Sequence, residues 1–158
     1  MPAAFRIEHR LGIPVPPQIV WRVLSDLPGW AAWNPLYIRA EGELRIGETL
    51  RLTEALPGAQ PADLAATVID WVPDNQILLE MRERAGLVRR MRYLEIEKLS
   101  DEASVFSNGE DWWGRLARWT PRPRRRSLRA GYQAMSEALS ERAIALWRQE
   151  GGAPTSGA

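Results

Sequence analysis

The first residues of the chain alternate between apolar and charged side chains. From Phe5 to Leu11 the odd positions are apolar, except for His9, and the even positions are charged. A period of two predicts a β-strand with one buried face, and His9 lies on that face. Prolines and then apolar residues spaced by three and four follow, which predicts a short helix that ends at residues 28–29. A second short helix is expected at Trp30–Trp33.

Six further strands are predicted in the middle of the chain. Apolar stretches between residues 37 and 113 are separated by short groups of glycine, proline, asparagine and aspartate, which are typical turn residues. Because the connections are short, we expect consecutive strands to run antiparallel. The strands are expected near Tyr37–Glu41, Glu48–Glu54, Leu64–Trp71, Gln76–Arg84, Val88–Leu99 and Ala103–Trp113.

The last apolar pattern has the spacing of a long helix. Six apolar residues recur there at intervals of three and four: Leu128, Tyr132, Met135, Leu139, Ala143 and Leu146. The segment before them, residues 114–127, is rich in proline and arginine and is predicted to be a loop. The last residues, 150–158, offer little to bury, so we expect a disordered tail after a single domain of residues 1–149.

This order of elements predicts an α+β fold. A curved antiparallel sheet of about seven strands needs its inner face covered, and the terminal helix has the largest apolar stripe to cover it. Two short helices would follow the first strand. Such an arrangement leaves space between the helix and the sheet, which is a natural place for a small ligand.

Composition narrows the possible functions. The chain has 158 residues, no cysteine and one histidine, which excludes disulfides, thiolate metal sites and sites with several histidines. We expect neither a metal nor a cofactor. The longest uncharged stretch, residues 27–38, is too short to span a membrane, and the first residues lack the apolar core of a signal peptide. A soluble, cytoplasmic protein is expected.

Several motifs, in this order, resemble one known family. The motifs are Pro16–Asp26, Trp33-Asn34-Pro35, Gly42 with Gly47, Leu94–Leu99, Gly109–Gly114 and Tyr132–Leu139. Together they resemble the polyketide cyclase/dehydrase and lipid-transport-like group of the START/Bet v 1-like (SRPBCC) superfamily, over roughly residues 4–148. The resemblance implies a helix-grip fold around a hydrophobic cavity. Members of the superfamily bind lipids, hormones or polyketides, and some catalyse cyclisation or dehydration.

The turn at residues 100–102 sets the register of the last hairpin. If Leu99 faces Ala103, then Arg92 lies opposite Glu110 on a face whose far end is apolar. An inward Arg92–Glu110 pair could hold a ligand oxygen, or Glu110 could act as a general base, or the pair could be purely structural. We expect Glu110→Gln to change ligand affinity more than melting temperature if the pair binds a ligand.

The candidate catalytic residues are Glu110, Arg92 and His9. His9 is either a core residue or an acid/base group, because the ordinary pKa of histidine is about 6.5. Tyr93 is a weaker candidate for the same role. The residues expected to contact a ligand lie on the inner face, the short helices and the helix stripe: Trp30, Trp33, Arg90, Arg92, Leu94, Asn108, Glu110, Trp112, Tyr132, Met135 and Leu139.

Arginines are concentrated in one segment. Seven of them and no acidic residue lie between Arg115 and Arg129, so that the rest of the chain carries a net charge of −6 against a total of +1. The segment could be a solvated loop, a contact with an anionic membrane surface, or a contact with an acidic protein. Nucleic acid is not expected as a partner, because no binding module is present and the remaining chain is acidic.

The leading functional hypothesis is binding of a small hydrophobic, lipid- or polyketide-like molecule between the sheet and the terminal helix. A polyketide cyclase or dehydratase is the first alternative. A peripheral membrane or protein-docking module that uses residues 115–129 is the second.

Overall fold

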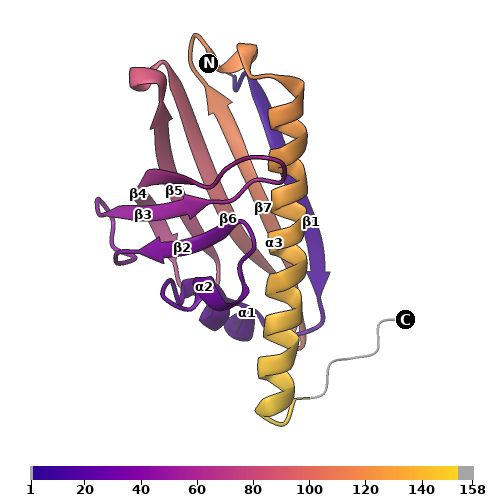
Figure 1. Cartoon of the computed structure of the whole chain (residues 1–158). Helices are drawn as coiled ribbons and strands as arrows, with labels where there is room; N and C mark the ends of the chain where they lie inside the picture. The colour runs from indigo at the N-terminus through magenta and orange to yellow at the C-terminus, as the bar shows by residue number, and fades with distance from the viewer. Residues whose placement is uncertain (1, 153–158) are drawn as a thin grey trace.

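Seven antiparallel strands form one sheet in the order β1-β7-β6-β5-β4-β3-β2, and the sheet curls around one long helix (Figure 1). The computed structural model describes residues 2–152. The elements are β1 (Phe5–Ile13), α1 (Pro17–Ser25), α2 (Trp30–Trp33), β2 (Tyr37–Glu41), β3 (Thr49–Glu54), β4 (Ala62–Val72), β5 (Gln76–Glu83), η1 (Arg84–Gly86), β6 (Val88–Ser100), β7 (Ala103–Trp113), η2 (Ala117–Trp119) and α3 (Arg122–Gln149).

Helix α3 covers the concave face of the sheet, and α1 and α2 lie below the short strands β2 and β3 (Figure 1). The predicted apolar stripe faces inward, since Leu128, Tyr132, Met135, Leu139 and Ala143 have no exposed surface. The predicted α+β helix-grip fold is therefore confirmed. Within residues 2–152, no helix is both long and apolar enough to cross a bilayer.

The register of the last hairpin agrees with the prediction along most of its length. Arg92 pairs with Glu110, and the same offset continues as far as Lys98 and Ser104. The pair next to the turn is different, because Ser100 rather than Leu99 lies opposite Ala103. A β-bulge at this point absorbs one extra residue without changing the faces of the strands beyond it.

The predicted loop at residues 114–127 is wrong in its second half. Helix α3 already begins at Arg122, after the short turn η2. Pro121 occupies the N-cap position and Pro123 lies in the first turn, where the missing N–H of proline removes no helical hydrogen bond. Arginine is also a good helix former, so a segment that is polar and rich in proline can still start a helix.

The chain after α3 is described only as far as Gly152. The Gly152 N–H donates to the Trp147 carbonyl at 2.9 Å, and Glu150 forms an ion pair with Arg22 of α1 at 2.6 Å. Residues 153–158, which make up most of the predicted disordered tail, lie outside the described residues.

Candidate functional site

Six charged side chains converge between the concave face of the sheet and the beginning of α3. They come from β3, β5, β6, β7 and α3, and they consist of three glutamates and three arginines. We call them the buried charge cluster: Glu54, Glu83, Arg90, Arg92, Glu110 and Arg124. Burying charges is costly unless each charge is paired and hydrogen-bonded, so the pairing determines what the cluster can do.

Arg90 forms ion pairs with all three glutamates of the buried charge cluster. Its guanidinium donates from Nε to Glu110 at 2.7 Å, from Nη1 to Glu83 at 2.6 Å and from Nη2 to Glu54 at 3.1 Å. It also lies over the Trp112 ring, 4.8 Å from the ring centre. The expected ion pair between Arg92 and Glu110 is therefore wrong, because the diagonal neighbour Arg90 is the partner of Glu110. A long arginine side chain reaches across to the diagonal position as easily as to the opposite one.

Glu110 accepts hydrogen bonds from three side chains. Arg90 donates to both carboxylate oxygens, the Trp112 indole N–H donates to Oε2 at 2.8 Å, and the Tyr132 hydroxyl also donates to Oε2. Glu110 has no exposed surface. Its two oxygens are thus engaged by donors from three side chains, which fix the position of the carboxylate.

Arg92 is held in a different way. Its guanidinium donates to the Tyr37 hydroxyl at 2.9 Å, to the Gly109 carbonyl at 2.8 Å and to the Asn108 side-chain oxygen. It lies 4.2 Å from the centre of the Tyr132 ring. Among residues 2–152, no carboxylate lies within 4.0 Å of the Arg92 nitrogens. Arg92 is therefore a fully buried cation whose contacts are neutral oxygens and aromatic rings.

The surroundings shift the pKa values of several groups in this region. Burial raises the pKa of Tyr37 to about 12 and raises the pKa of Tyr132 well above its ordinary value, with Glu110 adding to the second effect. Both hydroxyls therefore stay protonated at neutral pH. Burial alone would raise the pKa of Glu83, but hydrogen bonds and charge from Arg124 and Arg90 outweigh it, so the pKa lies below its usual value.

The other acid/base candidates do not join the buried charge cluster. His9 is half-buried opposite Asn108, and its Nδ1 is buried without a hydrogen-bond partner. The hydroxyl of Tyr93 points away from the helix and donates to Glu8 on the outer face at 2.5 Å. No two of the residues His9, Tyr93 and Glu110 are therefore placed together as an acid/base pair.

The family of the chain follows from its sequence as a whole. The model of the family described as polyketide cyclase / dehydrase and lipid transport matches residues 4–144. The chain belongs to this family. No match was found among curated protein sequences.

Solved structures of several proteins share the fold of this cyclase/dehydrase and lipid-transport family member. The ZhuI aromatase/cyclase from Streptomyces sp. R1128 has 24% identity and a TM-score of 0.74, covering 94% of this chain and 99% of that one. A START superfamily protein from Mycobacterium smegmatis has 16% identity and a TM-score of 0.71 over 89% and 98% of the two chains. Norcoclaurine synthase from Thalictrum flavum has 18% identity and a TM-score of 0.63 over 90% and 95%. At these identities the likeness establishes the fold.

The family and the fold fit a ligand-binding cavity between sheet and helix, but here side chains fill that space. Ten of the eleven residues expected to line the cavity have no exposed surface: Trp30, Arg90, Arg92, Leu94, Asn108, Glu110, Trp112, Tyr132, Met135 and Leu139. Neighbouring atoms enclose each of these side chains completely, so no water-sized space lies beside them. The eleventh, Trp33, is half-buried: its ring lies edge-on to Trp30, and it lines a surface depression beside α1, α2 and α3 together with Arg142.

The sequence analysis missed three members of the buried charge cluster, Glu54, Glu83 and Arg124, and also Tyr37, which accepts a hydrogen bond from Arg92. Tyr37 and Glu54 lie on predicted strands, and Glu54 shares the inward parity of Leu50 and Leu52, so alternation could have identified it. Glu83 is the last residue but one of the predicted strand Gln76–Arg84 and the last residue of β5. Arg124 escaped notice because its segment was predicted to be a loop.

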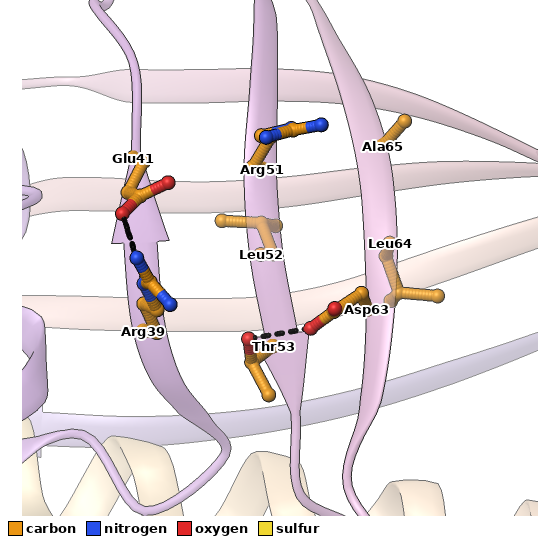
Figure 2. Close-up of a pocket in the computed structure, with 8 residues that line it drawn as sticks. All are labelled: Arg39, Glu41, Arg51, Leu52, Thr53, Asp63, Leu64 and Ala65. Carbon is orange, nitrogen blue, oxygen red and sulfur yellow. Dashed lines mark hydrogen bonds and ion pairs between the residues drawn. The ribbon is translucent and has the colours of Figure 1, made fainter.

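A separate depression lies on the outer face of β2, β3 and β4 (Figure 2). Arg39 pairs with Glu41 there, and the Thr53 hydroxyl donates to Asp63 at 2.8 Å. Most of its polar groups thus satisfy one another on the solvent side of the sheet. This depression is separate from the buried charge cluster.

Proposed function

We propose that the protein binds a small, uncharged hydrophobic molecule that carries a hydrogen-bond-accepting oxygen. The molecule would lie between the sheet and α3, with its oxygen at Arg92. The observation that supports this proposal is the state of Arg92, a fully buried guanidinium that contacts no carboxylate. Four of its five N–H groups donate to oxygens, and the fifth donates to the sulfur of Met135, a weak acceptor that a ligand oxygen would replace. Hydrogen bonds from an ionised donor to oxygen are about twice as strong as neutral ones.

The neighbours of Arg92 suit the rest of such a molecule. Tyr132 lies against its guanidinium plane, Met135 of α3 lies 3.7 Å away through its sulfur, and Leu79 is its cross-strand neighbour on β5. Methionine adapts readily to irregular shapes, so this part of the interior is suited to repacking around a guest. A polar point within an apolar lining is the usual composition of a small-molecule site.

Entry requires the interior to open, and few polar contacts hold it closed at the side of the β3–β4 connection. The Ser127 hydroxyl of α3 donates to the Pro57 carbonyl at 3.1 Å, in an exposed position. Leu36 and Leu56 lie directly against Gly131 of α3, where a side chain would come within 2.8 Å of Leu36. We propose that residues 55–61 move away from α3 to admit the ligand.

We propose binding rather than catalysis. A cyclase or dehydratase would need a group that moves a proton, and Glu110 is the only carboxylate of the buried charge cluster with no exposed surface. Its oxygens already accept from Arg90, Trp112 and Tyr132. His9 makes no hydrogen bond to it. This arrangement supports a structural role for Glu110 rather than one as general base.

A pair of matched fluorescent probes tests the proposal. Prodan is an uncharged naphthalene ketone, and dimethylaminonaphthalene has the same ring system without the carbonyl group. We expect the protein to bind prodan about tenfold more tightly, which corresponds to one charge-assisted hydrogen bond. Arg92→Met keeps a similar shape without the charge and should abolish this preference. Leu79→Met, a substitution at the neighbouring inward position, should keep it.

Unfolding curves of both variants would establish that they remain folded. Native mass spectrometry of the purified protein, followed by solvent extraction, should reveal a retained apolar compound that contains oxygen. Equal binding of the two probes by the wild type, or an unchanged preference in Arg92→Met, would contradict the proposal.

A further inference from the structure

One end of the molecule combines exposed apolar side chains with arginines. Trp119 is 67% exposed and Leu87 is 43% exposed, although both are large and apolar. They lie in η2 and after η1, which are at the same end of the sheet (Figure 1). We call this surface the end patch, which consists of Leu87, Arg115, Leu116, Arg118, Trp119 and Arg122.

A backbone hydrogen bond joins the two segments of the end patch, the one at Leu87 and the one at residues 115–122. The Leu116 N–H donates to the Leu87 carbonyl at 3.4 Å, and the Trp119 N–H donates to the Leu116 carbonyl at 3.1 Å. Gly114, with a φ of +113°, allows the β7–η2 connection to approach closely, since a Cβ there would lie 2.3 Å from the Leu87 oxygen. The apolar side chains of the end patch are therefore presented on a fixed backbone.

The arginines near the end patch fall into two groups. Arg124 and Arg125 turn inward, where Arg124 pairs with Glu83 at 2.7 Å and Arg125 lies 4.0 Å from the centre of the Phe5 ring. In the part of the chain that the structure describes, Arg115, Arg118 and Arg122 have no carboxylate within 4.0 Å, and all three are exposed. Their charges are thus available to an external partner.

The adjoining surface is also basic. A shallow depression beside Leu116 is lined by Arg89, Arg115 and Arg118, together with the apolar residues Pro2, Ala4 and Trp113, and no acidic residue lines it. Arg89 is the exception among these arginines, because it pairs with Glu80. Positive charge therefore surrounds the apolar centre of the end patch, while the chain outside residues 115–129 carries a net charge of −6.

We propose that the end patch docks the protein on an anionic membrane surface. Tryptophan favours the boundary between lipid head groups and hydrocarbon, and arginines near the surface are attracted to anionic lipids. Protein interfaces are also rich in tryptophan and arginine, so binding to an acidic protein is the alternative that the vesicle experiment tests against. This inference goes beyond the proposed ligand binding, since it concerns a surface outside the interior.

Co-sedimentation with lipid vesicles tests the proposal. We expect binding at low salt to vesicles of phosphatidylcholine mixed with phosphatidylglycerol, and weak binding to vesicles of phosphatidylcholine alone. Reversing two charges, Arg118→Glu with Arg122→Glu, should lower the partition coefficient at least about tenfold, and salt should weaken wild-type binding. Trp119→Ser should also lower the partition coefficient, and the binding that remains should still weaken with salt.

Two matched variants control for general effects of charge and hydrophobicity. Arg51→Glu reverses an exposed arginine on β3, and Ile46→Ser removes a residue that is 62% exposed in the β2–β3 connection. Both should bind vesicles as the wild type does. Absence of binding to the anionic vesicles at low salt would overturn the proposal. So would equal losses in the control variants, or equal binding to both kinds of vesicle.

Discussion

Arg90 and Arg124 donate to the same oxygen of Glu83, at 2.6 Å and 2.7 Å. Arg90 lies on β6 and Arg124 in the first turn of α3, so Glu83 connects the beginning of the helix to the middle of the sheet. The same first turn also contains Arg122, which belongs to the end patch. Glu83 therefore joins the first turn of α3 to the buried Arg90 of the sheet.

Stability should fall in acid, in part because of Glu83. The pKa of Glu83 is lowered in the native protein, as hydrogen bonds and charge from Arg124 and Arg90 outweigh the effect of burial. The stability that this carboxylate contributes is present above its unfolded pKa of about 4.3 and is lost as the pH falls through the native value. Urea unfolding at a series of pH values measures this slope. Glu83→Gln should flatten it and cost about 2 kcal/mol at neutral pH.

Glu110→Gln should mainly destabilise the fold. The substitution leaves the fully buried Arg90 without its fully buried carboxylate partner, and breaking a buried ion pair costs about 3–5 kcal/mol. This expectation replaces the earlier one, in which the substitution affected ligand affinity most. Denaturant unfolding provides the measurement, with the exposed Glu97→Gln as a control that should change stability by no more than about 0.5 kcal/mol. Similar losses in both variants would show that Glu110 is not a structural anchor.

None of the tyrosines should ionise near its ordinary pKa in the native protein. The chain has three tyrosines, and burial raises the pKa of each one above its ordinary value, that of Tyr37 to about 12. Because the native pKa is raised, this contribution to stability is complete below about pH 10 and is lost as the pH rises above that value. Tyrosinate absorbance of the native and the denatured protein measures both states. A native tyrosine that ionises at about pH 10 would contradict the expected burial.

Gly109→Ala should destabilise the protein through Tyr93. The two residues are opposite each other on β7 and β6, and a Cβ at position 109 would lie 2.2 Å from Cζ of the Tyr93 ring. Overpacking of this kind costs about 1–3 kcal/mol, because the ring must leave its position. In a protein that already carries Tyr93→Ala, the glycine substitution should cost little. A double-mutant cycle measures this coupling, and additive losses would contradict the predicted contact.

The sequence predicted the backbone better than the side chains. Strands β2 and β7 have the predicted bounds, and the hairpin register follows from one turn and a period of two. That register could not show that Arg90, and not Arg92, reaches Glu110, because it places Cα atoms and not the ends of long side chains. Alternation likewise indicates which residues point inward, but not whether their combined volume leaves a cavity.

The loop prediction failed for a related reason. The proline and arginine content of residues 114–127 is typical of irregular structure, but Pro121 and Pro123 lie where a helix tolerates proline. This error concealed Arg124, and with it the connection from α3 to Glu83. Recognition of proline positions at a helix start would have revealed both.

The buried charge cluster contains three guanidinium groups and three carboxylates, so its formal charge is zero. An uncharged guest preserves this balance, whereas an ionised guest would add a net charge where water is excluded, at a high cost. A weak acid would therefore enter in its protonated form only. Its apparent affinity should decrease about tenfold for each pH unit above its own pKa, so that acidity of the surroundings would control its uptake.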